Sequence, residues 1–490
     1  MPRTESWIER AARLHPDRIA IDAPDGTLSY AALERASWRV ADQLICGGIT
    51  SGMQLALTGV AGGTRFAVAL HGCLRAGVVA VPIDPRLPDA QQAQRAGACD
   101  DALAVDALAP VAELTAPIPD RSRPGGRIAR RSGHQRCATW TPPQAERCAP
   151  PLAGSGDDAQ TPAVLLYTSG STGPGTPVLL SRGALLWNAL GSAAALGQPP
   201  GERWLSAMPV AHVGGLTVFT RSAIGVTTAL VRPRFDVGEQ VELLMRGDPT
   251  ITSVVPTMLA RLLDAGLSHP PNLRLVLLGG APISRALVAR AEAAGVPVAG
   301  TYGMTETCSQ VYTAGAPLFC TDVALRSERA SGAQEDELVD AADAGSERAE
   351  ADDELLVRGP TLALGVAGAD GWLATGDRGA RRPDGTLAVI GRLTETIITG
   401  GENVAPTEIE AQLLAQPGIA DAAALGVPDA EWGQRLEARV VLVPGYALDA
   451  DALRATLRGV LPPFAVPKAI TAVDALPRTP TGKLRRRELR

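Results

Sequence analysis

A run of six small polar residues and glycines directly follows an apolar segment, and this order is typical of a phosphate-binding loop. The apolar segment covers residues 163–167, and the run consists of Thr168, Ser169, Gly170, Ser171, Thr172 and Gly173. Side chains this small allow backbone N–H groups and hydroxyls to surround phosphate oxygens. The alternative is a Ser/Gly linker, although a linker rarely begins where a buried strand ends. A Walker A loop is excluded, because the only Gly-Lys pair, at 482–483, is followed by leucine.

A second segment with nucleotide-binding chemistry lies at residues 300–307, after another apolar run. Within it, Tyr302 offers a flat ring face for a base, Thr305 a hydroxyl for a phosphate, and Glu306 a hard oxygen ligand for Mg²⁺. Read alone, this segment could equally be an ordinary turn at the end of a strand. Upstream, residues 277–282 end a further apolar run with two glycines that would let a ligand approach the backbone closely.

Charged residues farther along the chain add a candidate ribose ligand and a candidate catalytic ammonium group. Asp377 follows Thr375 and Gly376 in what the pattern predicts to be a turn, and a carboxylate there suits a ribose diol. Ordinary Asp-Gly turn chemistry is the alternative. Lys483 is one of two lysines among 46 basic residues. Because arginine supplies positive charge almost everywhere else, this lysine indicates a need for a compact ammonium group, with an exposed basic tail as the competing explanation.

The elements that must position these residues alternate between short apolar runs and Ala/Leu/Arg-rich helical stretches. Apolar runs typical of strands cover residues 55–57, 78–83, 163–167, 273–278 and 296–299. Their alternation with helical patterns predicts an α/β fold with largely parallel sheets.

Both ends of the chain carry local signals of their own. Ser6 and Glu9 have the spacing of a capping box that opens a helix, and residues 19–22 and 27–30 predict a hairpin. Near the other end, residues 450–461 predict a helix within a compact segment. We therefore expect a separate C-terminal unit.

Length and composition set the class of protein. The chain has 490 residues, 46% of them apolar, and a formal net charge of −6, so a large enzyme is expected rather than a disordered or fibrous protein. The acidic balance makes nucleic acid an unlikely partner. With no signal peptide and no apolar run of about 18 residues, we expect a soluble, cytoplasmic protein without membrane insertion. The seven cysteines lack metal-binding spacing and are expected to be reduced, structural thiols.

Two polar stretches interrupt the pattern of strands and helices. Residues 118–160 are rich in Pro, Gly, Arg and Ser, and residues 326–353 are acidic. Both predict surface loops or poorly ordered insertions. A change in character at residues 391–395 predicts a domain boundary.

In their order along the chain, the candidate segments resemble the adenylate-forming superfamily of acyl-CoA synthetases, firefly luciferase and peptide-synthetase adenylation domains. The resemblance spans about residues 7–487 and rests on five signatures, at 168–173, 302–306, 375–377, 391–392 and 481–483. It implies an α/β enzyme in which a carboxylate attacks the α-phosphate of ATP, giving an acyl-adenylate and pyrophosphate, after which a thiol displaces AMP. The resemblance also implies a large N-terminal domain of mixed sheets with flanking helices (1–391), a hinge (392–394) and a small mobile α+β C-terminal domain (395–490).

The resemblance assigns roles to individual residues. The loop from Thr168 to Gly173 would hold the phosphates, with Thr168 among the catalytic residues, and Glu306 would hold Mg²⁺. Lys483 would bridge the α-phosphate and the acyl carboxylate, and the loop with Gly400 and Gly401 would move towards a pantetheine channel for coenzyme A. The remaining nucleotide contacts would come from Gly279, Gly280, Ala281, Thr301, Tyr302, Gly303 and Thr305 around the base and phosphates, and from Asp377 and Arg392 at the ribose.

Within the superfamily, residues 302–310, 209–216 and 254–259 are most similar to the o-succinylbenzoate:CoA ligases of menaquinone biosynthesis. This similarity implies that His212 lines the acyl pocket and has a catalytic role, and that Arg221 holds the carboxylate of the substrate that does not react. A core histidine and a solvated helix arginine are the alternatives. A ligase for another aryl or medium-chain acid, or a non-catalytic adenylate-binding protein, remains open, as does a homo-oligomer.

Three features depart from the superfamily pattern. Thr176 stands where the phosphate loop usually has a lysine, which removes one positive charge near the β- and γ-phosphates. Thr394 replaces the usual hinge acid. The acidic region 326–353 is longer than expected.

Overall fold

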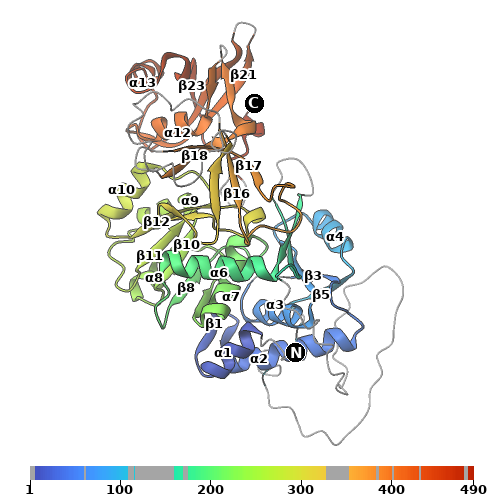
Figure 1. Cartoon of the computed structure of the whole chain (residues 1–490). Coiled ribbons are helices and arrows are strands. Elements are labelled where there is room, and N and C mark those ends of the chain that lie inside the picture. Colours follow the sequence, from blue (N-terminus) through green and yellow to red (C-terminus); the bar gives the residue numbers. More distant parts are fainter. Residues whose placement is uncertain are drawn as a thin grey trace, which may run out of the picture.

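The computed structural model describes residues 6–59, 62–106, 108, 115, 159–168, 175–326, 353–381, 386–399, 402–429, 432–478 and 484–489. Within these residues the chain forms a large α/β N-terminal domain and a small C-terminal domain, which Figure 1 shows in orange and red at one end of the molecule. No helix in this part of the chain has the length and apolar character needed to cross a membrane. The insertions predicted at 118–160 and 326–353 fall almost entirely outside the described residues.

The largest sheet has nine strands in the order β14-β13-β12-β11-β10-β8-β9-β1-β2. From β12 to β1 neighbouring strands are parallel, and β2, β13 and β14 add antiparallel edges. The strands are β1 (Ile19–Ala23), β2 (Gly26–Ser29), β8 (Arg203–Ser206), β9 (Thr228–Val231), β10 (Ile251–Val254), β11 (Leu275–Leu278), β12 (Val298–Tyr302), β13 (Tyr312–Thr313) and β14 (Ala316–Pro317).

Successive side chains of this sheet enter two different cores. Trp204 belongs to a core shared with residues of α2, α3 and α7, whereas Leu205 belongs to a core shared with α8, α9 and α10. Because side chains alternate along a strand, helices cover both faces of the sheet, as parallel strands require. The helices are α1 (Trp7–Leu14), α2 (Tyr30–Cys46), α3 (Thr64–Ala76), α4 (Asp89–Gly97), α6 (Arg182–Leu196), α7 (Val213–Gly225), α8 (Val237–Arg246), α9 (Pro256–Asp264) and α10 (Arg285–Ala293).

A second sheet has the order β5-β3-β4-β6-β7 and is parallel except for β7. It places the start of the predicted phosphate loop directly after the carboxyl end of β6, where ligands of open α/β sheets commonly bind. Its strands are β3 (Gln54–Thr58), β4 (Val79–Pro82), β5 (Asp101–Ala104), β6 (Pro162–Tyr167) and β7 (Pro177–Ser181).

A third, antiparallel sheet has the order β15-β16-β17-β18 and leads towards the C-terminal domain (Figure 1). Its strands are β15 (Asp322–Leu325), β16 (Asp353–Arg358), β17 (Leu373–Arg381) and β18 (Leu387–Arg392). The predicted boundary at 391–395 covers the end of β18 and the 3₁₀ turn Leu393–Glu395; its role as a hinge remains a prediction.

The C-terminal domain combines a five-stranded sheet with helices around its own apolar core. Ile409 and Leu413 of α12 pack there against Leu436 and Val440 of β22. Arg486 in the C-terminal tail forms an ion pair with Glu395, Nε to Oε2 at 2.9 Å. The elements are β19 (Ile397–Thr399), β20 (Glu402–Val404), α12 (Pro406–Leu414), β21 (Ile419–Asp429), β22 (Gly433–Leu442), α13 (Ala450–Leu457) and β23 (Ala469–Ala472).

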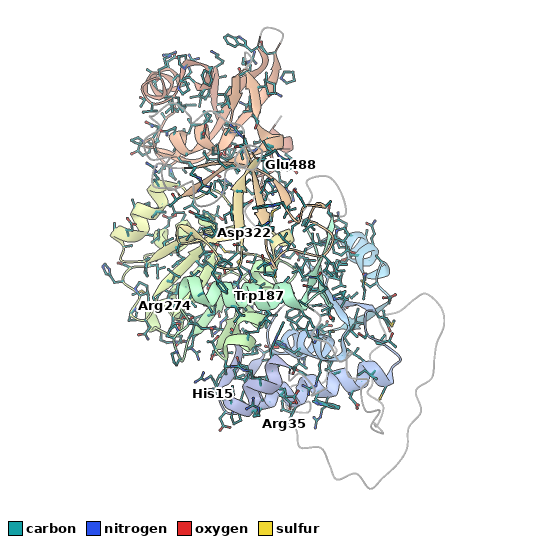
Figure 2. The ribbon with its side chains drawn as sticks, viewed as in Figure 1. His15, Arg35, Trp187, Arg274, Asp322 and Glu488 are labelled. Atoms are coloured by element: carbon teal, nitrogen blue, oxygen red, sulfur yellow. The ribbon has the colours of Figure 1, made fainter. Side chains whose placement is uncertain are left out.

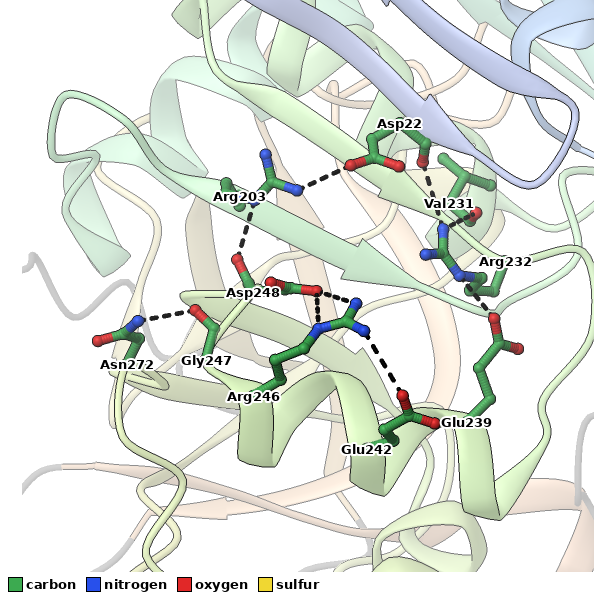
Figure 3. A network of polar contacts seen from close by, with 10 residues as sticks. All are labelled: Asp22, Arg203, Val231, Arg232, Glu239, Glu242, Arg246, Gly247, Asp248 and Asn272. Carbon is green, nitrogen blue, oxygen red and sulfur yellow. Dashed lines mark hydrogen bonds and ion pairs between the residues drawn. The ribbon is translucent and has the colours of Figure 1, made fainter.

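Ion pairs join strands of the large sheet to one another and to a neighbouring helix (Figure 3). Arg203 donates to Asp22 on β1 at 2.8 Å, and Arg232 after β9 pairs with Glu239 of α8 at 2.8 Å. Arg274, labelled in Figure 2, pairs with the buried Glu202 at 2.7 Å. These contacts fix the register of segments that are far apart in the sequence.

The structure confirms the local predictions at the N-terminus, shortens a predicted helix and shifts a predicted strand. The Ser6 hydroxyl accepts a hydrogen bond from the Glu9 N–H, and β1 and β2 form the predicted hairpin. The helix predicted over 450–461 ends at Leu457, because Gly459 and the following prolines cannot continue it. The strand predicted over 296–299 is instead Val298–Tyr302.

Candidate active site

Asp377 is the centre of the best-defined polar cluster in the candidate site. Tyr302, the last residue of β12, donates its hydroxyl hydrogen to Asp377 Oδ2 at 2.6 Å. Arg392, the last residue of β18, forms an ion pair from Nε to Asp377 Oδ1 at 2.9 Å. The structure thus brings together three residues that the sequence placed at the base and the ribose of a nucleotide.

The location of Asp377 corrects one prediction. Asp377 was expected on a turn, but it lies within β17, directly opposite Arg392 of β18 in the antiparallel register. The turn-like signal came from Gly376, which has a φ of +70° while its N–H donates to Glu354 Oε1 at 2.9 Å. A local irregularity between β16 and β17 therefore allows a Gly-Asp pair to lie inside a strand.

Burial determines the protonation state of Tyr302 in this cluster. Burial and the adjacent Asp377 carboxylate together raise the pKa of Tyr302 above its usual value. The tyrosine is therefore a neutral hydrogen-bond donor at physiological pH. Asp377 is 6% exposed, and its two oxygens are held in place by Tyr302 and Arg392.

Close backbone packing explains the glycines beside Tyr302. A Cβ on Gly279 would lie 2.6 Å from Thr301 Cγ2, and one on Gly303 would lie 1.5 Å from the Ser309 carbonyl oxygen. Gly280 has a φ of +79°, and Ala281 follows it in the loop after β11. A narrow layer of backbone at the carboxyl ends of β11 and β12 is consistent with the predicted adenine contact.

Glu306 and Thr305 lie on the 3₁₀ turn Thr305–Thr307, which follows β12. The Glu306 carbonyl accepts a hydrogen bond from the Ala363 N–H at 2.8 Å, so this turn is tied to the segment before β17. The Glu306 carboxylate is a hard oxygen donor of the kind that Mg²⁺ prefers. Among the described residues no cluster of three acidic, histidine or cysteine side chains forms a metal site.

The two described ends of the predicted phosphate loop are held together. The Thr168 N–H donates to the Thr176 carbonyl oxygen at 2.9 Å, which closes the loop at its neck. Gly175 adopts a φ of +81°, and a Cβ there would lie 2.3 Å from the Thr168 carbonyl oxygen. Only glycine fits this turn without strain.

Several predicted site residues lie outside the described residues. They are Ser169, Gly170, Ser171, Thr172, Gly173, Gly400, Gly401 and Lys483. Their roles remain predictions. The residues that flank the Lys483 segment, Arg478 and Leu484, form an antiparallel bridge on the C-terminal domain.

His212 precedes α7 and contacts a charged pair that sequence reasoning missed. Arg86 Nη2 donates to His212 Nε2 at 3.0 Å, and Asp84 Oδ2 lies 3.7 Å from the same nitrogen. Burial, with a further contribution from the charge of Arg86, lowers the pKa of His212 from 6.5 to about 4. The imidazole is therefore neutral near pH 7, and because arginine only donates, its remaining proton lies on Nδ1.

The sequence contained a signal that could have identified Asp84 and Arg86 as candidate site residues. They lie two and four residues after the end of β4, a parallel strand of the second sheet, and the carboxyl ends of parallel strands commonly carry ligand contacts. What the sequence could not show is that this strand end meets His212, 126 residues farther along the chain.

Arg221 is buried in the third turn of α7, so the alternative of a solvated helix arginine is wrong. It is 3% exposed, and its Nε and Nη2 both donate to Asn188 Oδ1, at 3.1 and 2.7 Å. Its guanidinium also lies 5.3 Å from the Trp204 ring centroid and near Cys308, two residues after Glu306. No Asp or Glu among the described residues is recorded in an ion pair with it. A buried charge with only an amide and a ring as partners is costly.

Comparisons with known proteins agree with this geometry. A family model described as AMP-binding enzyme matches residues 8–366, and one described as AMP-binding enzyme C-terminal domain matches residues 408–483. The chain is 31% identical over 506 residues to the 2-succinylbenzoate–CoA ligase of Bacillus licheniformis, covering 99% of each chain. It is 32% identical over 519 residues to the indoleacetate–CoA ligase of Aromatoleum aromaticum, covering 99% of this chain and 97% of that one.

A solved structure shares the whole architecture. The o-succinylbenzoate coenzyme A synthetase from Bacillus subtilis, in complex with ATP and magnesium ion, is similar with a TM-score of 0.76 and 28% identity, covering 99% of this chain and 98% of that one. The chain belongs to the AMP-binding enzyme family, and thus to the adenylate-forming superfamily. Within that superfamily it is of the AMP-forming acid–thiol ligase class.

Proposed function

We propose that this protein is an ATP- and Mg²⁺-dependent CoA ligase that converts o-succinylbenzoate to o-succinylbenzoyl-CoA through an acyl-adenylate, a reaction of menaquinone biosynthesis. The observation that carries the substrate assignment is the buried Arg221 with no carboxylate partner among the described residues. A dicarboxylate substrate would supply the missing negative charge. The similarity to 2-succinylbenzoate–CoA ligases supports the same acid.

The reaction divides between groups that bind and groups that neutralise charge. Asp377, held by Tyr302 and Arg392, would accept hydrogen bonds from the ribose hydroxyls. The Glu306 carboxylate would hold Mg²⁺, which would neutralise phosphate charge when bound, and Thr168 would contact the phosphates. The substrate carboxylate would then attack the α-phosphate, release pyrophosphate and leave an acyl-adenylate with AMP as leaving group.

The second half-reaction requires a different set of residues around the substrate. In the proposed sequence Lys483 stabilises charge during adenylation, and rotation of the C-terminal domain about residues 392–394 then removes it. The loop with Gly400 and Gly401 would approach the channel through which the thiol of coenzyme A attacks the acyl carbon. His212, neutral near pH 7, would line the acyl pocket without adding charge.

Selectivity between acids tests this proposal. We expect Arg221→Gln to lower kcat/KM for o-succinylbenzoate by about 10- to 100-fold, because a hydrogen-bonded charge pair contributes roughly 1.5–3 kcal/mol. Turnover of benzoate, which lacks the second carboxylate, should change little. Equal losses on both acids would contradict the role of Arg221.

A second variant separates substrate binding from structure. Asn188→Asp gives Arg221 a carboxylate partner at the position of the present amide oxygen. This should stabilise the helix pair, because the buried charge is neutralised, but it should selectively weaken o-succinylbenzoate binding. If Arg221 is only structural, Asn188→Asp will leave the preference among acids unchanged.

Two alternative activities have their own readouts. A ligase for another aryl or a medium-chain acid, which the indoleacetate–CoA ligase relative keeps open, would turn over monocarboxylates better. A protein that only binds adenylates would release no pyrophosphate, either with or without Lys483→Ala.

A further inference from the structure

Arg86 connects a buried carboxylate to the imidazole of His212. Its Nε donates to Asp84 Oδ1 at 2.9 Å, and its Nη2 donates to Asp84 Oδ2 at 2.6 Å. The same Nη2 lies 3.0 Å from His212 Nε2. An Nη2 group carries two hydrogens, so one can point to the carboxylate and the other to the imidazole. A single edge of the guanidinium therefore links the two side chains.

The Asp84 carboxylate fixes the plane of this guanidinium. A guanidinium is rigid and planar, so a fork of two hydrogen bonds to one carboxylate restricts it to one orientation. Asp84 is 6% exposed, and its Oδ1 also accepts a hydrogen bond from the Arg86 N–H at 3.0 Å. The second hydrogen of Nη2 consequently has a fixed direction, towards His212.

The backbone of His212 is fixed independently of this contact. Its N–H donates to the Pro209 carbonyl oxygen at 3.0 Å, and its own carbonyl oxygen accepts from the N–H groups of Gly215 and Leu216, both at 3.0 Å. Rotation of the side chain is the freedom that remains, and the contact with Arg86 restricts it.

The two charged neighbours of His212 Nε2 favour opposite tautomers of the imidazole. Asp84 Oδ2, at 3.7 Å, is beyond hydrogen-bond distance, whereas Arg86 Nη2, at 3.0 Å, is within it. Because arginine only donates, Nε2 accepts and the proton lies on Nδ1. Among the described residues Nδ1 has no hydrogen-bond partner, and the side chain is 25% exposed. The ring therefore presents an N–H group whose direction is set by Arg86.

We propose that Arg86, held by Asp84, is a positioning residue that keeps the proton of His212 on Nδ1, so that the imidazole donates a neutral hydrogen bond to an oxygen of the acyl substrate. The inference rests on the proposed function, which places His212 in the acyl pocket. Arg86 acts through His212 and does not itself contact the acid. Without Arg86, Asp84 would be the nearest charged group to Nε2, and a carboxylate would draw the proton from Nδ1 to Nε2.

The tautomer of His212 is measured directly by NMR on the enzyme with ¹⁵N-labelled histidine, because a protonated and a bare ring nitrogen have different chemical shifts. The chain has five histidines, and the His212 signals are those that disappear in His212→Gln. The spectra are taken at about pH 8, well above the pKa of this imidazole, which burial lowers to about 4. We expect the proton on Nδ1 in the unaltered enzyme and in Arg86→Lys, whose ammonium also donates, and on Nε2 in Arg86→Met.

Kinetics on the same variants show whether the tautomer matters for the acid. Arg86→Met should raise the KM for o-succinylbenzoate about tenfold, because Nδ1 then has no proton to donate, while the KM for ATP stays within about twofold. Arg86→Lys should restore most of the lost affinity for the acid. A purely structural role of Arg86 would affect both KM values and lower the unfolding temperature.

Arg435 provides a matched control. It also holds a carboxylate two residues away through Nε and Nη2, which donate to Glu437 Oε1 at 3.0 and 2.7 Å. Its side chain is 42% exposed, compared with 35% for Arg86, and among the described residues it contacts no histidine. Arg435→Met should leave the tautomer of His212 and both KM values unchanged.

The outcomes distinguish this inference from the proposed function. A proton on Nε2 in the unaltered enzyme would overturn the inference without any variant, and so would a proton that stays on Nδ1 in Arg86→Met. Equal rises in the KM for the acid and for ATP, or no rescue by Arg86→Lys, would overturn it as well. An unaltered enzyme that turns over no acid would overturn the proposed function, while a change of tautomer in Arg86→Met would still support the control of His212 by Arg86.

Discussion

Replacing Tyr302 by phenylalanine removes a single hydroxyl from the centre of the site and keeps the ring. The hydroxyl donates to Asp377 Oδ2 at 2.6 Å, and the carboxylate it holds is 6% exposed. A hydrogen bond to a charged, buried acceptor contributes about 1.5–3 kcal/mol. Arg392 still holds the other oxygen at 2.9 Å, so we expect about half of this amount to appear in nucleotide binding.

An effect of about 1 kcal/mol corresponds to roughly a fivefold rise in the KM for ATP. Because the ring face remains, kcat should stay within about twofold. The assay is AMP formation at varied ATP and saturating acid and CoA. Since burial and Asp377 raise the pKa of Tyr302, the KM for ATP of the unaltered enzyme should not respond to tyrosine ionisation up to about pH 10.

Tyr312→Phe is the matched control for this experiment. Tyr312 lies opposite Tyr302 on β13, and its hydroxyl donates to the Gly315 carbonyl oxygen at 2.6 Å. It makes a bond of the same length without touching Asp377. An unchanged KM for ATP in Tyr302→Phe, or an equal rise in Tyr312→Phe, would refute the view that the hydroxyl positions the ribose-binding carboxylate.

Other predictions concern pH, packing and the metal. Burial lowers the pKa of His71 from 6.5 to about 4. As the pH falls below 6.5, His71 is therefore protonated in the unfolded chain before it is protonated in the folded one, and the free energy of unfolding should fall by up to about 3 kcal/mol by pH 4. Thermal unfolding of His71→Leu should show a smaller loss of stability over the same pH range. Gly303→Ala should abolish ATP binding and lower the unfolding temperature, because its Cβ would overlap the Ser309 carbonyl, whereas Gly300→Ala meets only a side-chain methyl at 3.3 Å and should fold. Glu306→Gln should raise the Mg²⁺ concentration for half-maximal activity about tenfold at an unchanged unfolding temperature; an unchanged Mg²⁺ requirement would contradict its role as a ligand.

The parts of the site that were predictable are those in which residue type alone restricts the chemistry. Tyr302 and Asp377 were assigned to the nucleotide from their residue types, and Arg392 was added by the resemblance to the superfamily; the structure brings all three into contact. The α/β fold also followed from local patterns, since strand and helix periodicities are properties of short windows.

Long-range contacts account for what the sequence did not show. Arg86 lies in a loop after β4, and only the packing of this loop against the start of α7 reveals its contact with His212. The burial of Arg221 likewise depends on Asn188, 33 residues earlier on a neighbouring helix. Asp377 was expected on a turn, because the irregularity that accommodates Gly376 in a strand arises from its pairing partner.

The most direct test of the central claim is CoA-dependent AMP formation by the unaltered enzyme. It should be measured with ATP and Mg²⁺ on o-succinylbenzoate, benzoate and a medium-chain fatty acid at equal concentrations. We predict a strong preference for o-succinylbenzoate, with CoA consumed in step with AMP formed. Faster turnover of either monocarboxylate would contradict the assigned substrate, and AMP formation that does not consume CoA would contradict the ligase itself.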